Sequence, residues 1–155
     1  MIDKKLRTPI AALTISGLGF ISILGYEGYT SMAIQPVEGD VWTYGFGTTG
    51  GVKEGDTIEP MAAIQRAYSD IDAVQKRVKS CIKVELSQGE FDAFCSLAYN
   101  IGSAAFCSST LVKKVNGGDH AGACKELLRW VYFKGKKLNG LVNRRESEYK
   151  QCMGY

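Results

Sequence analysis

The sequence has little histidine, and its cysteines are widely spaced. It contains one histidine and five cysteines in 155 residues, and no two cysteines have the C-x-x-C spacing of a zinc or redox site. We therefore expect neither a metal site nor a cofactor. The single histidine, His120, follows a Gly-Gly-Asp turn, so we expect its side chain to be exposed and without a chemical role.

A strong excess of charge of one sign is also absent. The chain has 19 basic and 16 acidic residues, which gives a net charge of +3. This balance is too small to indicate a nucleic-acid partner, although a mildly basic surface suits an anionic polymer such as a bacterial cell wall. The length and the 45% hydrophobic content predict a domain with a real core, and we expect a monomer.

Residues 8–26 contain no charged side chain. They follow a short basic flank with Lys4, Lys5 and Arg7. This pattern predicts a signal peptide or a membrane-spanning segment with its N-terminus inside, and a buried helix of a soluble domain is the alternative.

Two details favour a weak, uncleaved anchor. Nine of the residues in 8–26 are glycine, serine, threonine or alanine, so the affinity of this run for a bilayer is expected to be marginal. No clear A-x-A cleavage site precedes Glu27. We therefore divide the chain into an anchor segment, residues 1–26, and a catalytic domain, residues 27–155.

Helical patterns dominate the rest of the chain. Ser87 and Glu90 have the spacing of a capping box, which predicts the start of a helix. Turn residues followed by β-formers predict one small sheet near residues 30–47. The fold class is therefore α+β and mostly α. Helices are predicted over residues 61–78, 88–101, 108–115, 120–130 and 141–152, with a basic loop over 134–140.

Glu27 closes the apolar run and is the candidate catalytic acid. Its apolar neighbours are expected to raise its pKa, as a proton donor working near neutral pH requires. A strand-like segment with Thr43 and a further acid, Asp40 or Glu38, follows. Together these groups predict a carboxylate-based hydrolytic site, and a solvated helix end is the alternative for Glu27.

Several blocks of sequence resemble the T-even-type phage lysozymes, glycoside hydrolase family 24. The similarity runs in order from about residue 25 to residue 149. The blocks are Glu27-Gly28, the segments 42–49, 91–102 and 106–116, and Trp130 followed by 140–146.

The resemblance implies a lysozyme-like fold, with a small N-terminal β-hairpin subdomain, a helical lobe and a cleft between them. It implies hydrolysis, with inversion, of the β-1,4 bond between N-acetylmuramic acid and N-acetylglucosamine in peptidoglycan. Glu27 would be the proton donor, and Thr43 would hold the attacking water. The protein would be an endolysin that lyses the host cell at the end of phage infection.

The second carboxylate departs from the family pattern. In the family, eight residues separate the Glu from an Asp or Cys, and five more separate that residue from the Thr. Counted forward from Glu27, this spacing leads to Pro36, and counted back from Thr43 it leads to Val37, because the interval is one residue longer in this chain. Asp40 is the preferred replacement and Glu38 the alternative, while Asp40 as a mere turn former stays open. If neither acts, a single-Glu lytic transglycosylase or a non-catalytic, membrane-anchored wall-binding protein becomes the alternative.

Four residues resemble substrate-binding positions of the family. Trp42 and Tyr99 are expected to stack on sugar rings, Asn100 to bind an acetamido group, and Arg145 to contact wall carboxylates. Each has a simpler interpretation, as a core aromatic residue or as part of a helix-surface ion pair.

The N-terminal segment resembles the signal-anchor-release segments of certain phage endolysins. That resemblance implies an inactive form tethered to the periplasmic side of the host inner membrane, followed by release into the periplasm. Export favours disulfides. We expect Cys81 to pair with Cys107 and Cys124 with Cys152, with Cys95 as a free core thiol, although the sequence leaves the connectivity open.

Overall fold

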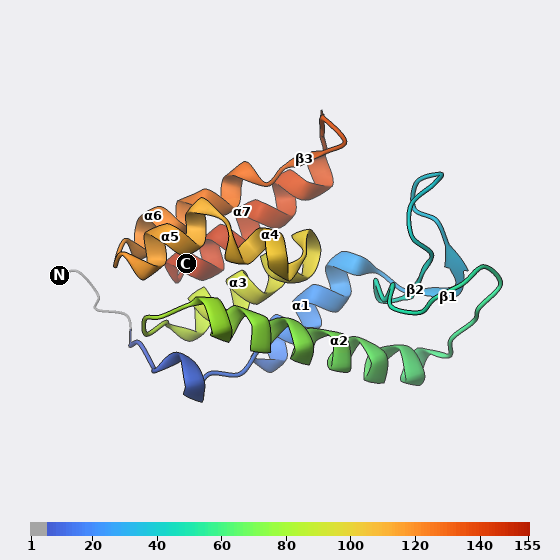
Figure 1. Ribbon diagram of the computed structural model, residues 1–155, viewed down its shortest axis with the longest axis horizontal. Coiled ribbons are helices and arrows are strands. Elements are labelled where there is room, and N and C mark those ends of the chain that lie inside the picture. The colour runs from blue at the N-terminus through green and yellow to red at the C-terminus, as the bar shows by residue number, and fades with distance from the viewer. Residues whose placement is uncertain (1–5) are drawn as a thin grey trace. The chain divides into compact units, whose positions relative to one another are not determined.

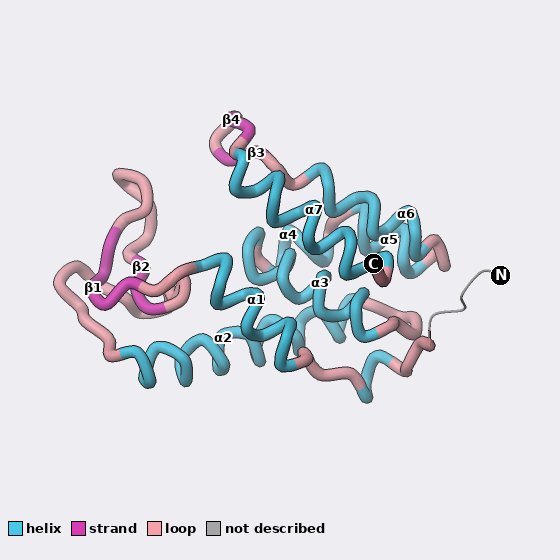
Figure 2. The backbone as a smooth tube through the Cα atoms, turned by 180° about the vertical axis from the view of Figure 1, so that it is seen from behind, coloured by secondary structure: helices cyan, strands magenta, loops and turns pink. Residues whose placement is uncertain are grey.

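The computed structural model describes residues 6–155, and the chain divides into two compact units (Figures 1 and 2). A helical unit contains residues up to 19 together with residues 74–155, and a hairpin unit contains residues 20–73. Two helices, α1 (Gly17–Glu27) and α2 (Pro60–Cys81), contribute residues to both units. Lys4 and Lys5 of the basic flank lie outside the described residues.

The helical unit is built around α3 (Gln88–Ile101), which is buried continuously from Glu90 to Ala98. Ser87 and Glu90 form the predicted capping box, since the side chain of each accepts a hydrogen bond from the backbone N–H of the other. The other elements of this unit are η1 (Ile10–Ala12), α4 (Ser103–Cys107), α5 (Thr110–Asn116), α6 (His120–Glu126), η2 (Leu127–Arg129), β3 (Tyr132–Phe133), β4 (Lys136–Lys137) and α7 (Asn139–Met153).

Two disulfides tie these helices together, and both predicted pairings are confirmed. Cys81 at the end of α2 bonds to Cys107 at the end of α4, with Cα atoms 5.6 Å apart. Cys124 in α6 bonds to Cys152 in α7, with Cα atoms 5.7 Å apart. Cys95 is a free thiol inside α3, as predicted, and burial raises its pKa well above the usual range.

The hairpin unit contains the predicted small sheet. Strand β1 (Thr30–Ile34) pairs antiparallel with β2 (Thr43–Gly45). Thr30 lies opposite Gly45 and Ile34 opposite Thr43, so β1 carries extra residues and the register shifts between the two pairs. Residues 35–42 form the loop that connects β1 to β2, and this loop carries both candidates for the second acid, Asp40 and Glu38.

The uncharged run of residues 8–26 is not one continuous element. Residues 13–16 form neither helix nor strand and lie between η1 and α1. The N–H of Ile15 donates to Gln75 Oε1, and the N–H of Ser16 donates to Asp92 Oδ1, both over 3.0 Å. Side chains of the helical unit thus satisfy backbone groups that a helix would bond internally. Within residues 6–155, no helix is both long enough and apolar enough to cross a bilayer.

Local differences from the sequence predictions come from short breaks. The helix predicted over 108–115 is α5, which begins at Thr110 after its cap Ser109, and the short helix α4 that precedes it was not predicted. The helix predicted over 120–130 changes to a 3-10 turn at Leu127. The basic loop predicted over 134–140 instead forms part of the β3–β4 hairpin, and α7 begins at Asn139.

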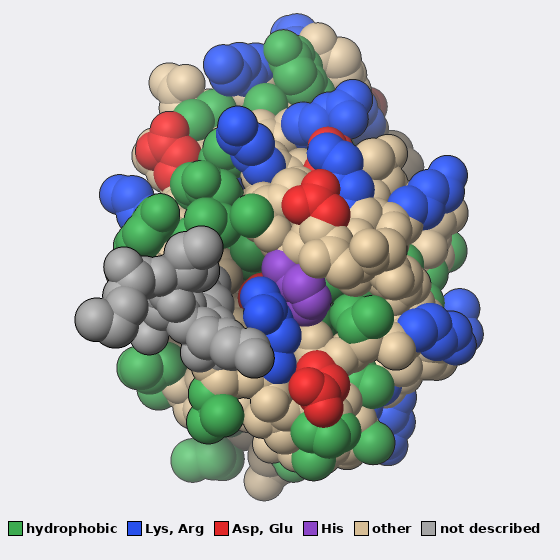
Figure 3. Space-filling model, turned by 90° about the vertical axis from the view of Figure 1, so that its left-hand side faces the viewer, with side chains coloured by type: hydrophobic (Ala, Val, Ile, Leu, Met, Phe, Trp, Pro, Cys, Tyr) green, Lys and Arg blue, Asp and Glu red, His purple; other side chains and the backbone are tan. Residues whose placement is uncertain are grey.

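His120 is not exposed, which corrects the prediction made from its turn. Its Nδ1 lies 3.2 Å from Glu90 Oε1, and its side chain is only 16% accessible. Arg7 Nη2 lies 3.2 Å from the same oxygen. The histidine is the purple residue in Figure 3, with basic side chains beside it. One buried carboxylate of α3 thus joins the N-terminal segment to the start of α6.

Candidate active site

Glu27 is the last residue of α1, and its side chain is partly buried. Gly28 follows with a φ of 68° and turns the chain out of the helix toward β1. Gly47, with a φ of 83°, approaches the carboxylate so closely that a Cβ atom there would lie 2.9 Å from Glu27 Oε2. The glycine-rich end of the hairpin therefore lies directly against the candidate proton donor.

Hydrogen bonds to α2 hold this glycine-rich loop in place. The buried hydroxyl of Thr48 donates to Asp70 Oδ2 over 2.5 Å. Arg66 donates to the carbonyl of Gly50 over 2.8 Å and pairs with Asp70, with Nε 3.5 Å from Oδ1. None of these three side chains belongs to a motif that points to the site. Their only sequence signal was the i, i+4 spacing of Arg66 and Asp70 on a predicted helix.

Thr43 begins β2, two residues before Gly45, and is partly buried. Its hydroxyl donates to the carbonyl of Val41 over 3.3 Å, so the side chain oxygen also has lone pairs that accept hydrogen bonds. With its O–H donated to Val41, the hydroxyl can still accept a hydrogen bond from a water molecule, which is one way in which a residue positions a water.

Asp40 lies in the β1–β2 connection, three residues before Thr43, and is partly buried. Its N–H donates to the carbonyl of Val37 over 3.0 Å, and its own carbonyl accepts from Gln35 Nε2 over 2.7 Å. Glu38 lies in the same loop and is exposed. Of the two candidate acids, Asp40 is therefore the one whose backbone is held in place by hydrogen bonds on both sides.

The predicted substrate-binding residues have different surroundings. Trp42 is partly buried in the hairpin unit, while Tyr99 is partly buried and Asn100 exposed in the last turn of α3. Arg145, in contrast, has 0% accessibility, and its Nε lies 2.8 Å from Glu148 Oε2. A side chain without accessible surface cannot reach a polymer, so we assign Arg145 to packing and not to substrate binding.

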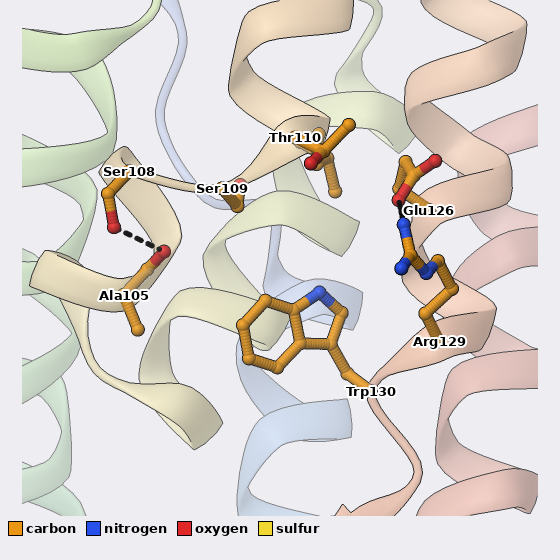
Figure 4. A pocket seen from close by; sticks show the side chains of 8 residues that line it. Ala105, Ser108, Ser109, Thr110, Glu126, Arg129 and Trp130 are labelled. Atoms are coloured by element: carbon orange, nitrogen blue, oxygen red, sulfur yellow. Dashed lines mark hydrogen bonds and ion pairs between the residues drawn. The ribbon is translucent and has the colours of Figure 1, made fainter.

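The helical unit has a pocket of about 420 Å³ that lacks a suitable acid (Figure 4). The indole of Trp130 lies across it, and Glu126 and Arg129 pair at its side, 2.9 Å apart. The hydrogen bond from Lys114 outweighs partial burial and holds the pKa of Glu126 below its usual value. Glu126 therefore stays ionised and is unsuited to donate a proton. The pocket is lined by Ala105, Ser108, Ser109, Thr110, Leu111, Glu126, Arg129 and Trp130.

The hairpin unit thus contains a carboxylic acid at a helix end, a second acid and a hydroxyl, and two carboxyl groups are what most glycoside hydrolases use. The described residues contain no group of three or more His, Cys, Asp or Glu side chains placed to hold a metal ion. A helical unit combined with a hairpin that carries such a site defines a lysozyme-like α+β protein.

Comparison with known proteins gives the family. A model of the phage lysozyme family matches residues 25–148. An endolysin of Acyrthosiphon pisum secondary endosymbiont phage 1 is 42% identical, over 86% of this chain and 94% of its own length. A SAR-endolysin of Enterobacteria phage P21 is 36% identical over 98% of both chains.

A solved structure agrees with this match. The endolysin from Escherichia coli O157:H7 phage FAHEc1 superposes with a TM-score of 0.79 at 33% identity, covering 92% of this chain and 94% of that one. The chain belongs to the phage lysozyme family. Its activity is that of an endolysin, a lysozyme-type hydrolase of peptidoglycan.

Proposed function

We propose that Glu27 is the general acid with which this endolysin cleaves the β-1,4 bond between N-acetylmuramic acid and N-acetylglucosamine. The observation that supports this role is the contact between Glu27 and Gly47, which brings the hairpin backbone against the carboxylate. A proton from Glu27 would go to the glycosidic oxygen as the bond to the anomeric carbon breaks. The leaving sugar then departs as an alcohol.

In this proposal Thr43 positions the attacking water, and Asp40 accepts its proton. Water attacks the anomeric carbon from the face opposite the leaving group, which inverts the configuration and produces a reducing end. The hydrogen bonds of the Asp40 backbone to Val37 and Gln35 support this choice, because they fix the loop on which the base lies. Trp42, Tyr99 and Asn100 are proposed to bind the sugar rings and acetamido groups.

We further propose that residues 1–26 tether the chain to the host inner membrane before release into the periplasm, leaving residues 27–155 as the catalytic domain. Support comes from the uncharged run and from the similarity to a SAR-endolysin over nearly the whole chain. In the structure residues 7–16 of this segment contact the rest of the helical unit. Arg7 pairs with Glu90, Thr8 bridges to Leu86, and Ser16 donates to Asp92.

Product analysis with Glu27→Gln tests the catalytic proposal. The wild-type protein should release muropeptides with reducing ends from purified sacculi, and Glu27→Gln should be at least about 100-fold slower, because acid catalysis contributes 10²-fold or more. The exposed Glu54 of the same unit gives the control, and Glu54→Gln should keep its activity.

Mass spectrometry of the products separates the alternatives. A 1,6-anhydro product would indicate lytic transglycosylation, in which the 6-hydroxyl of the sugar attacks the anomeric carbon and Glu27, having given up its own proton, accepts the hydroxyl proton, so that no second carboxylate is needed. If Glu27→Gln keeps more than about a tenth of the wild-type rate, Glu27 is not the acid. Binding of sacculi by the wild-type chain without any soluble product would identify a non-catalytic wall-binding protein.

A further inference from the structure

The β3–β4 hairpin, residues 132–137, projects beyond the start of α7 (Figures 1 and 2). Tyr132 pairs with Lys137 and Phe133 with Lys136, and each of these residues is exposed. The two tip residues have positive φ angles, 47° at Lys134 and 77° at Gly135. A two-residue turn of this kind fits tight hairpins, but it disfavours a residue with a side chain at its first position.

Lys134 therefore stands out as a strained position. Among the described residues it is the one non-glycine with a positive φ. Asparagine, aspartate or glycine would form the same turn more easily. A lysine at the solvent-exposed tip thus brings a positive charge at a cost to the local backbone, which is a pattern typical of functional surface positions.

Positive charge is concentrated around this hairpin. Residues 129–138 contain four of the 19 basic residues and none of the 16 acidic ones. Since the whole chain has a net charge of +3, the remaining residues sum to −1. The stretch therefore accounts for all the excess positive charge of the protein.

Large apolar side chains lie exposed among these charges. Tyr132 is 63% accessible, Phe133 is 43% and Leu138 is 41%. Each aromatic residue has a lysine as its cross-strand partner, and Lys134 Nζ lies 5.5 Å from the centre of the Phe133 ring. Aromatic rings flanked by basic side chains are characteristic of surfaces that dock at a bilayer interface.

We propose that this hairpin docks on an anionic phospholipid surface. Tyr132 and Phe133 enter the headgroup region, and the lysines of the hairpin bind lipid phosphates. The interaction brings a released enzyme back to the face of the membrane, and it does not depend on hydrolytic activity. Opposite charge and exposed apolar surface together provide the attraction.

The composition favours lipid over a glycan strand. Sugar hydroxyls both donate and accept hydrogen bonds, and they are bound chiefly by carboxylates, which accept, and by amides and alcohols, which do both. Residues 129–138 contain no Asp, Glu, Asn, Gln, Ser or Thr. A lipid headgroup needs only positive charge for its phosphate and apolar area for the glycerol and upper acyl region, and the hairpin supplies both.

Vesicle sedimentation with the full chain tests this proposal. Vesicles of phosphatidylethanolamine with phosphatidylglycerol are compared with vesicles of phosphatidylcholine alone. The charge variant is Lys134→Gln with Lys136→Gln and Lys137→Gln. Each basic residue near an anionic surface strengthens binding by roughly fivefold, so this variant should bind the anionic vesicles on the order of 100-fold more weakly.

Matched variants separate the hairpin from general charge effects. Lys113, Lys125 and Lys150 are exposed lysines elsewhere in the helical unit. Changing all three to glutamine removes the same charge and should weaken vesicle binding much less. An apolar variant, Tyr132→Ser with Phe133→Ser, should lose about tenfold or more of the affinity. Residues 1–26 are the same in every variant, so differences in vesicle binding among the variants report on the hairpin.

Two outcomes would overturn the proposal. The first is equal vesicle binding by the hairpin variants and the scattered control. The second is loss of binding to purified sacculi with vesicle binding retained, which would assign the hairpin to the wall. Hydrolysis of isolated sacculi should stay unchanged in all variants, so failure of the membrane proposal is distinguishable from failure of the catalytic one.

Discussion

Gly47 lies so close to Glu27 that a single added methyl group would collide with the carboxylate, at 2.9 Å from Oε2. We predict that Gly47→Ala lowers the rate of wall hydrolysis by roughly 10- to 100-fold, because small displacements of a catalytic group have effects of this size. The positive φ of 83° adds a stability cost of about 1–2 kcal/mol for a residue with a Cβ.

Gly25→Ala is the matched control for that variant. Gly25 lies within α1, has no positive φ, and a Cβ there would meet nothing within 4 Å. This change should keep activity and stabilise the helix by up to about 1 kcal/mol. The rate of wall hydrolysis and the free energy of unfolding in urea are measured for both variants. Equal activity of the two would show that the close approach of Gly47 does not position Glu27.

The two candidate bases are separated by their own substitutions. Asp40→Asn should lose most of the activity, because the amide cannot accept the proton of the attacking water, whereas Glu38→Gln should lose little. Turbidity assays on isolated walls give both values. An inactive Glu38→Gln variant would reverse the assignment, and full activity of both would favour the transglycosylase alternative.

Glu90 should make stability depend on pH. Burial alone raises the pKa of Glu90, but the Ser87 N–H, Arg7 and His120 together outweigh it and hold the pKa below the usual 4.5. A carboxylate with a depressed pKa stabilises the fold above its unfolded pKa, and this contribution is lost as the pH falls through the folded pKa. Wild-type stability should therefore decrease more steeply below pH 4.5 than that of Glu90→Gln.

Urea unfolding at a series of pH values from 7 down to 3 measures this difference. At pH 7 the Glu90→Gln variant should be about 1–3 kcal/mol less stable, since its partners lose a charged acceptor. Glu85 is exposed and lies five residues earlier, before the start of α3, and Glu85→Gln should follow the wild-type curve. Parallel curves for the wild type and Glu90→Gln would contradict the role assigned to Glu90.

The release proposal is tested by making the N-terminal segment more apolar without disturbing its docked form. Ser16 bonds to Asp92, and a Cβ on Gly19 would lie 2.7 Å from Asp92 Cγ, so these positions must stay unchanged. Gly17, Ser22 and Gly25 are exposed. Leucine at these three positions adds roughly 1–2 kcal/mol of partition energy each, and should trap the exported protein in the membrane fraction, without lysis.

Cell fractionation together with a lysis curve gives the readout. Two leucines placed at Asn143 and Ser147, which are exposed on α7, add apolar surface outside the segment and should leave release unchanged. Lysis on the wild-type schedule by the triple-leucine variant, with the protein in the periplasm, would mean that the segment is not a release switch.

Local signals predicted much of the fold. The capping box at Ser87 is a short-range pattern, and it correctly located the start of α3. The β-formers after residue 40 correctly indicated a small hairpin. Both signals depend on neighbours within a few residues, so the sequence contains all the information that they need.

Long-range burial could not be predicted in the same way. Arg145 and Glu148 have the spacing of a surface pair, and only the packing of α7 against α3 shows that the ion pair is fully buried. Likewise, the turn at His120 looked exposed because its partner Glu90 lies 30 residues away. The contact of Ser16 with Asp92 spans 76 residues and has no local signature.

All four bonded cysteines lie between residues 81 and 152, and each crosslink joins elements of the helical unit. Both disulfides can therefore form before residues 1–26 pack against the helical unit. Under the release proposal, residues 74–155 would be crosslinked first, and Gln75, Asp92 and Glu90 would then bind the segment through Ile15, Ser16 and Arg7. Under the release proposal, the timing of lysis would depend on how fast the segment leaves the membrane, and the folding rate of the body would not limit it.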